Sequence, residues 1–370
     1  MRSLTRCVHF PAAPGDPHRP VATPIYQTAT FSQPGALACG PYDYSRSGNP
    51  TRAVLEEQLA RLEGGRQAFA VSSGMAALAL LLRLQQGHVL AGEDLYGGTH
   101  RLLSRHDASF VDFRDLDSVR ACIRPDTWLL LVESPTNPLL HRADLAALAK
   151  LAHRHGCLLA VDNSLMSPLR QTPLALGADI VVHSATKFLG GHADLSAGAL
   201  VVREQGLAER IAWLQNAEGC GLGPFDCFLL LRGLKTLGLR IRAQDQSARR
   251  IEALLRRHPA VSRVHAAGGS VLSFETGSVQ CSQRVVEATR LFTIAVSFGS
   301  VGSTISLPCA MSHASIPPEQ RVLPEDLVRL SVGIEDPADL EEDLVAALGA
   351  SRRLQSSEVL AQPIRPAMGS

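Results

Sequence analysis

The sequence has no excess of charge, no long apolar run and no closely spaced cysteines. Its net charge is +1, which argues against a nucleic-acid-binding surface and against an acidic tail. The longest strongly apolar run, residues 75–82, is too short to cross a bilayer, and residues 1–20 lack the apolar stretch of a signal peptide. We therefore expect a soluble, cytoplasmic protein that binds neither membranes nor nucleic acids.

The eight cysteines form no C-x-x-C pair, and the histidines show no ligand spacing. This pattern argues against a disulfide framework and a zinc site, so we predict no metal. Of the 370 residues, 45% are hydrophobic and 19% are charged, without internal repeats. This is an ordinary globular composition, and the length is sufficient for two or three structural units.

Residues 1–50 are rich in proline, glycine, tyrosine and serine and show no long helical period. They predict an extended N-terminal arm. An arm without a core of its own must pack on something else, and a second subunit is the natural candidate.

Residues 51–225 alternate between helix-like and strand-like segments, which predicts an α/β domain with a mostly parallel sheet and helices on both faces. The predicted helices span residues 51–63, 74–84 and 143–155, and the predicted strands span residues 128–133, 158–162, 180–183 and 198–202. Ligands of such sheets bind beyond the carboxyl ends of the strands. Glu133, Asp162 and Ser184 fall at such ends and should therefore lie together.

Residues 226–350 predict a linking helix followed by a smaller C-terminal α+β domain. The long helix covers residues 226–255, further helices 283–290 and 337–348, and strands 271–274, 293–297 and 327–332. Residues 351–370 are expected to form a frayed tail.

The run V-V-H-S-A-T-K-F-L-G-G-H places Lys187 after an apolar strand, with hydroxyl groups at Ser184 and Thr186. Such a lysine can bind the aldehyde of pyridoxal 5'-phosphate (PLP) and then take the Cα proton of a substrate, and burial beside another cation favours its neutral form. A surface lysine is the alternative. Asp162, at the end of L-L-A-V-D, would face the pyridine nitrogen. Its alternative role is to cap the following turn.

A phosphate site is predicted where S-S-G-M-A-A opens an apolar helix, because free N–H groups at a helix N-terminus bind anions. Gly74 and Met75 would donate these groups, with help from the Ser184 and Thr186 hydroxyls; a simple serine N-cap is the alternative. The arm carries Tyr44 and Arg46, which could bind the phosphate of a neighbouring subunit. Alternatively, they belong to a polar loop that faces water.

Three further side chains are candidates for contacts with cofactor or substrate. Tyr96, in D-L-Y-G-G-T, could lie flat over a ring and act as an acid or base, or could simply be a rigid aromatic in a turn. Arg329 is a lone charge in the apolar run L-V-R-L-S-V and could hold a substrate carboxylate. An internal salt bridge is its alternative. Ser297 could donate to the same carboxylate.

Eight motifs together carry a family resemblance: Y-S-R-S-G-N-P-T, S-S-G-M-A-A, D-L-Y-G-G-T, V-E-S-P-T-N-P-L, V-D-N-S, H-S-A-T-K-F-L-G-G-H-A-D, L-L-L-R-G-L-K-T-L and L-V-R-L-S-V-G-I-E-D. In this order they resemble the trans-sulfuration, or Cys/Met-metabolism, family of PLP enzymes over roughly residues 20–350. The resemblance implies a fold-type-I, aminotransferase-like architecture and a homotetramer of two dimers that share active sites. It also implies the cofactor roles given above and places Asn137, Ser297 and Arg329 near the substrate carboxylate or the cofactor oxygen.

Departures from the family pattern bear on the substrate. Val296 stands where cystathionine lyases often carry glutamate, which resembles methionine γ-lyase, yet Gly98 stands where that enzyme typically has cysteine. Gly302 replaces a common glutamate, and Ala193 replaces the serine of the usual G-H-S-D. The chain is also shortened around residues 84–110 and between residues 265 and 271.

The resemblance implies an amino-acid substrate and favours γ-elimination, which releases a thiol, ammonia and a 2-oxo acid. Val296 motivates an uncharged thioether such as methionine, with homocysteine and cystathionine as related substrates. Two alternatives stay open: γ-replacement by an incoming thiol, and a non-catalytic PLP-binding member of the family.

Overall fold

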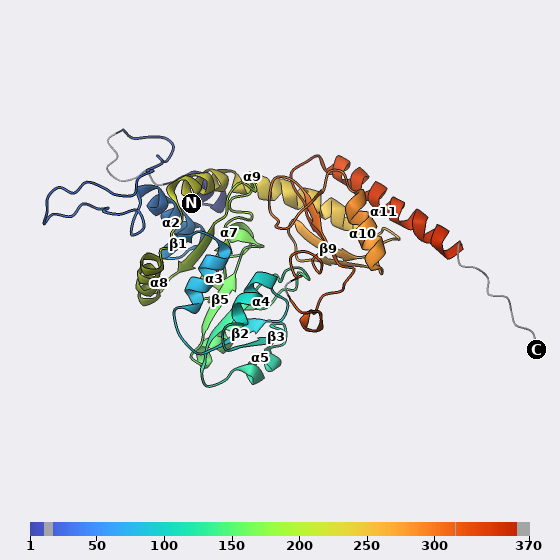
Figure 1. The fold of residues 1–370 in the computed structure, drawn as a ribbon, viewed down its shortest axis with the longest axis horizontal. Helices are drawn as coiled ribbons and strands as arrows, with labels where there is room; N and C mark the ends of the chain where they lie inside the picture. Colours follow the sequence, from blue (N-terminus) through green and yellow to red (C-terminus); the bar gives the residue numbers. More distant parts are fainter. Residues whose placement is uncertain (11–17, 315, 361–370) are drawn as a thin grey trace, which may run out of the picture.

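A computed structural model describes residues 1–10, 18–314 and 316–360. Two sheets, each covered by helices, are linked along one long helix, α9 (Figure 1). The helices are α1 (Ser3–Val8), α2 (Pro50–Glu63), α3 (Gly74–Leu82), α4 (Gly97–Leu103), α5 (Leu116–Cys122), α6 (Leu145–Arg154), α7 (Ser167–Arg170), α8 (Gln205–Glu218), α9 (Pro224–Leu255), α10 (Val279–Ala288) and α11 (Pro337–Leu360), with 3-10 helices η1 (Pro173–Leu176) and η2 (Pro318–Gln320). The strands are β1 (Gln67–Val71), β2 (His88–Gly92), β3 (Ala108–Val111), β4 (Thr127–Glu133), β5 (Leu158–Asp162), β6 (Ile180–Ser184), β7 (Gly198–Val202), β8 (Arg263–Ala266), β9 (Val271–Glu275), β10 (Thr293–Ile294), β11 (Thr304–Ser306) and β12 (Val328–Ser331).

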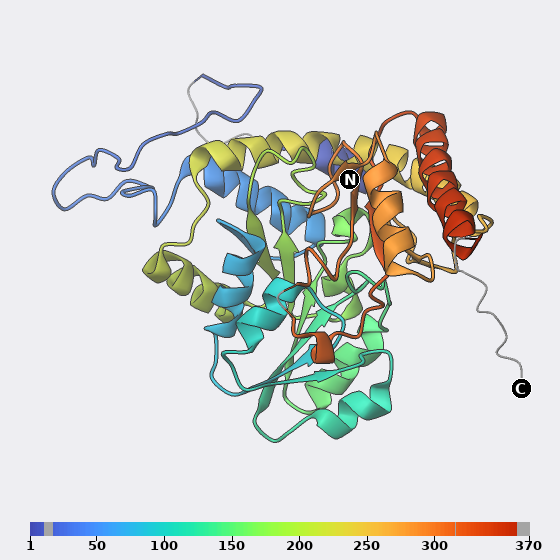
Figure 2. The same cartoon turned by 45° about the vertical axis from the view of Figure 1, so that its right-hand side comes forward.

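The larger sheet has the strand order β1-β7-β6-β5-β4-β2-β3. Only β7 runs antiparallel to its neighbours, so the predicted mostly parallel sheet is confirmed. Side chains alternate along each strand: Val181 packs into a core with α2 and α9, whereas Ile180 and Val182 pack into a second core with α3 and α8. Helices therefore cover both faces, as predicted, and the strands lie between them (Figure 2).

The smaller sheet has the order β10-β11-β12-β9-β8. Val328 and Leu330 of β12 enter a core built with the C-terminal half of α9 and with α10 and α11. Because alternate residues of a strand face opposite sides, Arg329 points away from that core. The alternation along β12 thus places the Arg329 side chain on the face of the smaller sheet opposite to α9, α10 and α11.

Local signals explain where the first helix of the larger domain lies. The Asn49 side chain accepts hydrogen bonds from the backbone N–H groups of Thr51 and Arg52, Pro50 occupies the first turn, and Gly64 ends α2 with φ +72°. These are the residue types that favour a helix start and stop. They fix α2 close to the predicted range.

Three sequence predictions differ from the structure. The arm is not extended throughout, because Ser3–Val8 forms α1, whose Cys7 is buried against the core that contains α2 and α9. The predicted strand 293–297 stops at Ile294, where its pairing with β11 ends, and Ser297 has φ +82°. The predicted tail begins as helix, because α11 continues to Leu360. The remainder of the tail, residues 361–370, lies outside the described residues.

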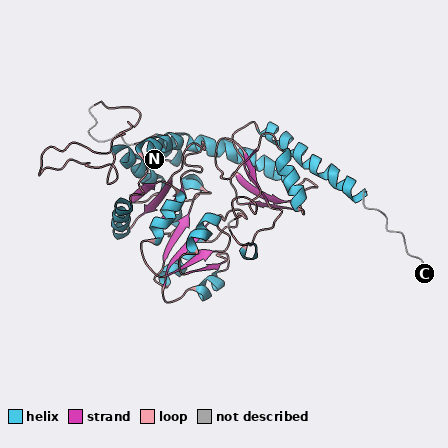
Figure 3. Ribbon diagram, in the orientation of Figure 1, coloured by secondary structure: helices cyan, strands magenta, loops and turns pink. Residues whose placement is uncertain are grey.

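From residue 18 to α2 the chain forms a long loop that extends away from both sheets (Figures 1 and 3). Val21 and Leu37 within it are fully exposed. This part of the chain keeps the extended form that we predicted for the arm. Its packing on a second subunit stays a prediction.

Replacing Gly233 of α9 with alanine should destabilise the fold. A Cβ at this position would lie 2.3 Å from the carbonyl oxygen of Gly190 and 2.9 Å from that of Leu189, so backbone must move. We expect the free energy of unfolding to fall by about 2 kcal/mol in a denaturant titration. The control is Gly349→Ala in α11, where a Cβ meets nothing within 4 Å. It should stabilise by about 0.5–1 kcal/mol. Equal effects of the two substitutions would contradict this packing argument.

Candidate active site

A cavity of about 570 Å³ lies at the carboxyl ends of β4, β5 and β6 and is closed by segments of the smaller domain. Eleven of the predicted site residues line it: Gly74, Met75, Tyr96, Asn137, Asp162, Ser184, Thr186, Lys187, Val296, Ser297 and Arg329. The fold therefore brings together residues that span more than 250 positions of sequence, as expected for strand ends of a parallel sheet.

The Lys187 amine lies next to the Ser297 hydroxyl, with Nζ 2.6 Å from Oγ. It is also 5.1 Å from the centre of the Phe298 ring. Burial, and then the positive charge of Arg329, lower the pKa of Lys187 to about 8, against the opposing effect of Asp162. About a tenth of this amine is therefore neutral at pH 7, far more than for an ordinary lysine, and the neutral form can bind an aldehyde or accept a proton.

Asp162 is a half-buried carboxylate that forms no ion pair within the described residues. One of its oxygens accepts a hydrogen bond from the backbone N–H of Ser164 at 2.9 Å, which is the turn-capping contact that we held as its alternative role. Burial raises the pKa of Asp162 above its usual value, although the hydrogen bonds from Ser164 oppose the shift. A protonated pyridine ring in the cavity would supply the cation that this carboxylate lacks.

An anion cradle lies at the N-terminus of α3. The Ser73 side chain accepts from the Ala76 N–H, which leaves the N–H groups of Gly74 and Met75 at the open end of the helix. A Cβ on Gly74 would lie 2.8 Å from the Ser184 Cβ, so glycine lets the two segments approach. The Ser184 hydroxyl has no partner among the described residues. Thr186 is less free than predicted, because its hydroxyl already bonds the backbone of Ala197.

Arg329 is 2% exposed. Its guanidinium donates to the Asn137 Oδ1 at 2.9 Å and to the Ser297 carbonyl oxygen at 3.0 Å. Both acceptors are neutral, and no ion pair to Arg329 occurs among the residues that the structure describes. This arrangement disfavours the internal salt bridge and leaves the charge for a substrate carboxylate. The Ser297 hydroxyl accepts from Lys187 and its carbonyl oxygen holds Arg329, which leaves the hydroxyl proton available, so its predicted donation to a carboxylate stays a prediction.

Tyr96 is fixed by a residue for which the sequence analysis proposed no role. Glu133 Oε2 accepts a hydrogen bond from the Tyr96 backbone N–H at 3.0 Å, at the start of α4. The Tyr96 side chain lines the cavity and is 41% exposed. A Cβ at Gly98 would lie 2.4 Å from the Tyr96 Cε1. Glycine is therefore required for this ring position, and a larger residue would displace the ring.

Burial and the neighbouring Asp162 raise the pKa of Glu133 well above its usual value. The cross-strand register between β4 and β5 pairs these two residues. The sequence analysis placed Glu133 and Asp162 together because both lie at the carboxyl ends of strands. Other lining residues were not proposed for the site, although three of them, Ser73, Thr99 and Ser164, lie in motifs quoted above. The rest lie outside those motifs: Leu78, Arg101, Ser196, Phe298, Met311, Ser312 and Ala314.

Tyr44 and Arg46 do not line the cavity of their own chain. They lie on the protruding arm, with the Arg46 guanidinium 5.4 Å from the centre of the Tyr44 ring. Any contact with a phosphate would therefore take place in another subunit. Their predicted role stays a prediction.

The sequence profile of the family described as "Cys/Met metabolism PLP-dependent enzyme" matches residues 4–349. The chain belongs to this family. It is 51% identical over 357 residues to "Cystathionine beta-lyase, chloroplastic" of Arabidopsis thaliana, which covers 89% of this chain and 77% of that protein. It is 44% identical over 372 residues to "Cystathionine beta-lyase MetC" of Bacillus subtilis, covering 93% and 95% of the two chains. A solved structure of cystathionine gamma-lyase from Lactobacillus plantarum superimposes with a TM-score of 0.92 at 39% identity, covering 95% and 100%.

Membership of the Cys/Met metabolism family confirms the predicted fold type I and PLP as the cofactor. The cavity fits this group on its own features: a half-buried amine, a half-buried carboxylate without an ion pair and an anion cradle on a helix N-terminus. In this family member, Gly74, Met75 and Ser184 would hold the phosphate, Asp162 the pyridine nitrogen and Lys187 the aldehyde carbon.

Within the described part of this family member, no helix is long and apolar enough to cross a membrane, and no group of three or more histidine, cysteine or acidic side chains is arranged to hold a metal ion. The cytoplasmic location and the homotetramer stay predictions.

The lowered pKa of Lys187 predicts that, in the PLP-free protein, this lysine is acylated at a lower pH than an ordinary lysine. Modification by an acylating reagent should rise with pH around a midpoint near 8, because the neutral amine is the nucleophile. Arg329→Gln should move the midpoint upward and Asp162→Asn downward, following their opposite charges. Peptide mapping by mass spectrometry can follow each site, since the sequence has three lysines, Lys150, Lys187 and Lys235. A midpoint at the ordinary lysine value of 10.5 would contradict the burial argument.

Proposed function

We propose that this chain is a PLP-dependent carbon–sulfur lyase that cleaves L-cystathionine by β-elimination, releasing homocysteine, ammonia and pyruvate. One observation carries the proposal: a half-buried, partly neutral amine at Lys187 lies in the same cavity as Asp162 and the charged Arg329. This combination can remove a Cα proton, stabilise the charge that results and hold the substrate in place.

Lys187 and its neighbours would carry out the proton transfers of the reaction. PLP, when bound, supplies an electron sink for the pair left on Cα. The Lys187 amine would take the Cα proton, and its 2.6 Å contact with the Ser297 hydroxyl would orient Nζ. As the Cβ–S bond breaks, the departing thiolate would take a proton from Lys187 or from the Tyr96 hydroxyl. Hydrolysis of the remaining three-carbon fragment gives pyruvate and ammonia.

The clamp for the α-carboxylate would be Arg329, with Asn137 as its partner. Arg329 is held by two hydrogen bonds to neutral oxygens, so its geometry is fixed before substrate arrives. A preorganised guanidinium binds a carboxylate bidentately at little entropic cost. The Cα–H bond would then be presented to Lys187.

Charge in the outer part of the cavity favours cystathionine over methionine. Arg101 of α4 lines the cavity and is exposed, so it offers a cation to the distal carboxylate of cystathionine. Methionine has no such group. Relatives at 51% and 50% identity are named cystathionine β-lyases, whereas the relative named cystathionine γ-lyase is 42% identical. These values support cleavage on the cysteine side of the thioether.

γ-Elimination from an uncharged thioether such as methionine is the second candidate. Val296 supports it, because this side chain is 54% exposed at the cavity and adds no charge there. γ-Replacement by a thiol is a third candidate, supported by 44% identity to a protein named cystathionine gamma-synthase from Mycobacterium bovis. Both reactions use the same Cα proton transfer.

The products from L-cystathionine decide between these candidates. β-Elimination gives pyruvate and homocysteine, whereas γ-elimination gives 2-oxobutanoate and cysteine. The PLP-loaded protein should form pyruvate and homocysteine in equal amounts, with little 2-oxobutanoate, and should release little methanethiol from methionine. An O-acylhomoserine, with and without cysteine, tests replacement. The proposal fails if 2-oxobutanoate predominates, if an added thiol is required, or if no substrate releases a 2-oxo acid.

Arg101→Ala should weaken the binding of cystathionine selectively. We expect KM to rise about fivefold, since an exposed ion pair contributes up to about 1 kcal/mol. KM for S-methyl-L-cysteine, which has no distal carboxylate, should change by less than twofold. The matched control is Arg105→Ala, at an exposed position that does not line the cavity. An equal rise in KM for the two substrates would exclude the distal contact.

A further inference from the structure

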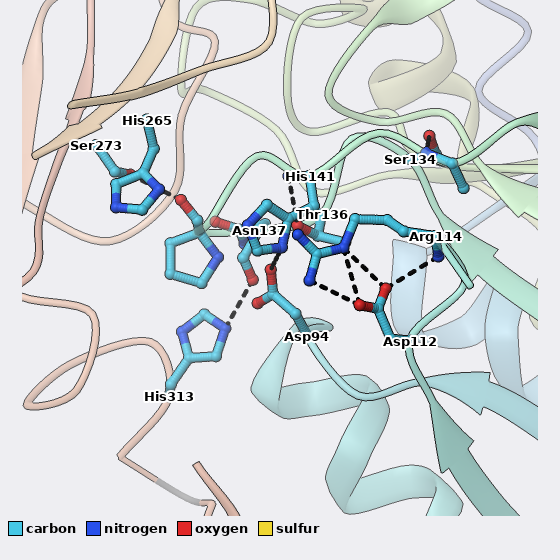
Figure 4. Close-up of polar contacts among 12 residues, drawn as sticks. Asp94, Asp112, Arg114, Ser134, Thr136, Asn137, His141, His265, Ser273 and His313 are labelled. Carbon is cyan, nitrogen blue, oxygen red and sulfur yellow. Dashed lines mark hydrogen bonds and ion pairs between the residues drawn. The ribbon is translucent and has the colours of Figure 1, made fainter. Parts of the chain in front are cut away.

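The segment between β11 and β12 reaches from the smaller domain to the cavity and carries Ser312 and His313. Ser312 lines the cavity, while His313 is 1% exposed and points toward Asn137 in the larger domain (Figure 4). Neither residue has a role in the reaction as derived above. Their hydrogen bonds nevertheless determine which groups face the substrate.

The hydrogen bonds of His313 fix its tautomer. Nε2 lies 3.0 Å from the backbone carbonyl oxygen of Asn137. A carbonyl oxygen can only accept, so Nε2 carries the proton. Nδ1 lies 2.9 Å from the Ser312 Oγ. Burial, and then the positive charge of Arg329, lower the pKa of His313 to about 4, so the ring is neutral and Nδ1 accepts.

The Ser312 hydroxyl must therefore donate its proton to His313. Its oxygen receives no hydrogen bond from the residues that the structure describes, and the side chain lines the cavity. The group presented to a ligand is an oxygen with free lone pairs. Such an oxygen is an acceptor, suited to an ammonium group rather than to a carboxylate.

We propose that Ser312, oriented by His313, is the acceptor for the ammonium group at the distal end of the substrate. The inference rests on the proposed function, because it requires a substrate with a second amino group, as in cystathionine. Together with Arg101, Ser312 would recognise both charges of that distal end. Ser312 is a specificity-determining residue and His313 is the positioning residue behind it.

Several other acceptors of the cavity already have a hydrogen bond or a proposed partner. Glu133 accepts from the Tyr96 N–H, the Ser297 hydroxyl accepts from Lys187, and Asp162 would face the pyridine nitrogen. Val296 has no polar side-chain atom. Among the described residues that line the cavity from the smaller domain, Ser312 offers a side-chain oxygen that accepts no hydrogen bond and can serve an ammonium group.

His313 also ties Ser312 to the reacting end of the cavity. Its ring meets the Tyr96 ring edge-on, with the centres 6.4 Å apart, and its Nε2 bonds the residue whose side chain holds Arg329. From the other side, Arg321 donates to the carbonyl oxygens of Ala314 and Ile316, at 3.2 and 2.6 Å. The Ser312 oxygen therefore has a defined position relative to the α-carboxylate clamp.

The test compares L-cystathionine with S-(3-carboxypropyl)-L-cysteine, which has the same atoms except the distal amino group. In the PLP-loaded enzyme, Ser312→Ala should lower the ratio of kcat/KM for cystathionine to that for the analogue about tenfold, as expected for a lost hydrogen bond to a charged group. Ser262→Ala, at an exposed position of the smaller domain outside the cavity, is the control and should leave the ratio unchanged.

Binding gives a second readout without turnover. In a Lys187→Ala background, calorimetry should show that Ser312→Ala raises Kd for cystathionine about tenfold relative to Kd for the analogue. If the wild-type enzyme forms pyruvate from cystathionine but the two ratios stay unchanged in Ser312→Ala, the inference is wrong and the proposed function stands. If the wild-type enzyme forms no pyruvate from either compound, the proposed function fails and this inference fails with it.

The role of His313 is tested by His313→Phe, alone and combined with Ser312→Ala. Phenylalanine keeps a ring but loses both nitrogen contacts, so the selectivity ratio should fall as it does in Ser312→Ala. In the Ser312→Ala background, His313→Phe should slow both substrates equally, through the lost bond to Asn137. A further fall in the ratio in the double variant would show that His313 acts by a route other than Ser312.

Discussion

The amine of Lys187 is enclosed by groups that restrict both its charge and its direction. Burial and Arg329 disfavour the ammonium form, Asp162 favours it, and Ser297 accepts a hydrogen bond from Nζ. The balance leaves the amine able to exchange a proton near neutral pH. Each of these partners comes from a different strand or loop, so the protonation of one side chain depends on both sheets being formed.

Arg329 connects the two halves of the site. It lies on β12 of the smaller sheet, yet its guanidinium bonds Asn137 in the segment that follows β4 of the larger sheet. The same cation lowers the pKa of both Lys187 and His313. After burial, this one charge is the next largest cause that disfavours the protonated form of Lys187 and of His313. Its burial is tolerated because neutral oxygens accept both of its hydrogen bonds.

The sequence was sufficient to predict site residues that can be placed from hydrophobic periodicity and from the ends of strands. Lys187, Asp162 and Arg329 each follow or interrupt an apolar run, and such positions are readable without coordinates. Glu133 could be placed but not given a role, because its contact is with a backbone N–H group. The contacts of Ser312 and His313 could not be predicted, since they join a loop to a carbonyl group 176 positions away. The early end of β10 was missed because Ile294 and Val296 keep a period of two, which predicts a strand.

Helix α9 belongs to two hydrophobic cores. Leu230 and Leu234 pack beneath the larger sheet, whereas Ile251 and Leu255 pack beneath the smaller one. A continuous rod of 32 residues embedded at both ends resists bending, because flexure would break backbone hydrogen bonds and disturb packing in both places. Both sheets are consequently anchored to the same helix, so a substitution that bent α9 would change the distance between the strand that ends in Asp162 and the strand that carries Arg329.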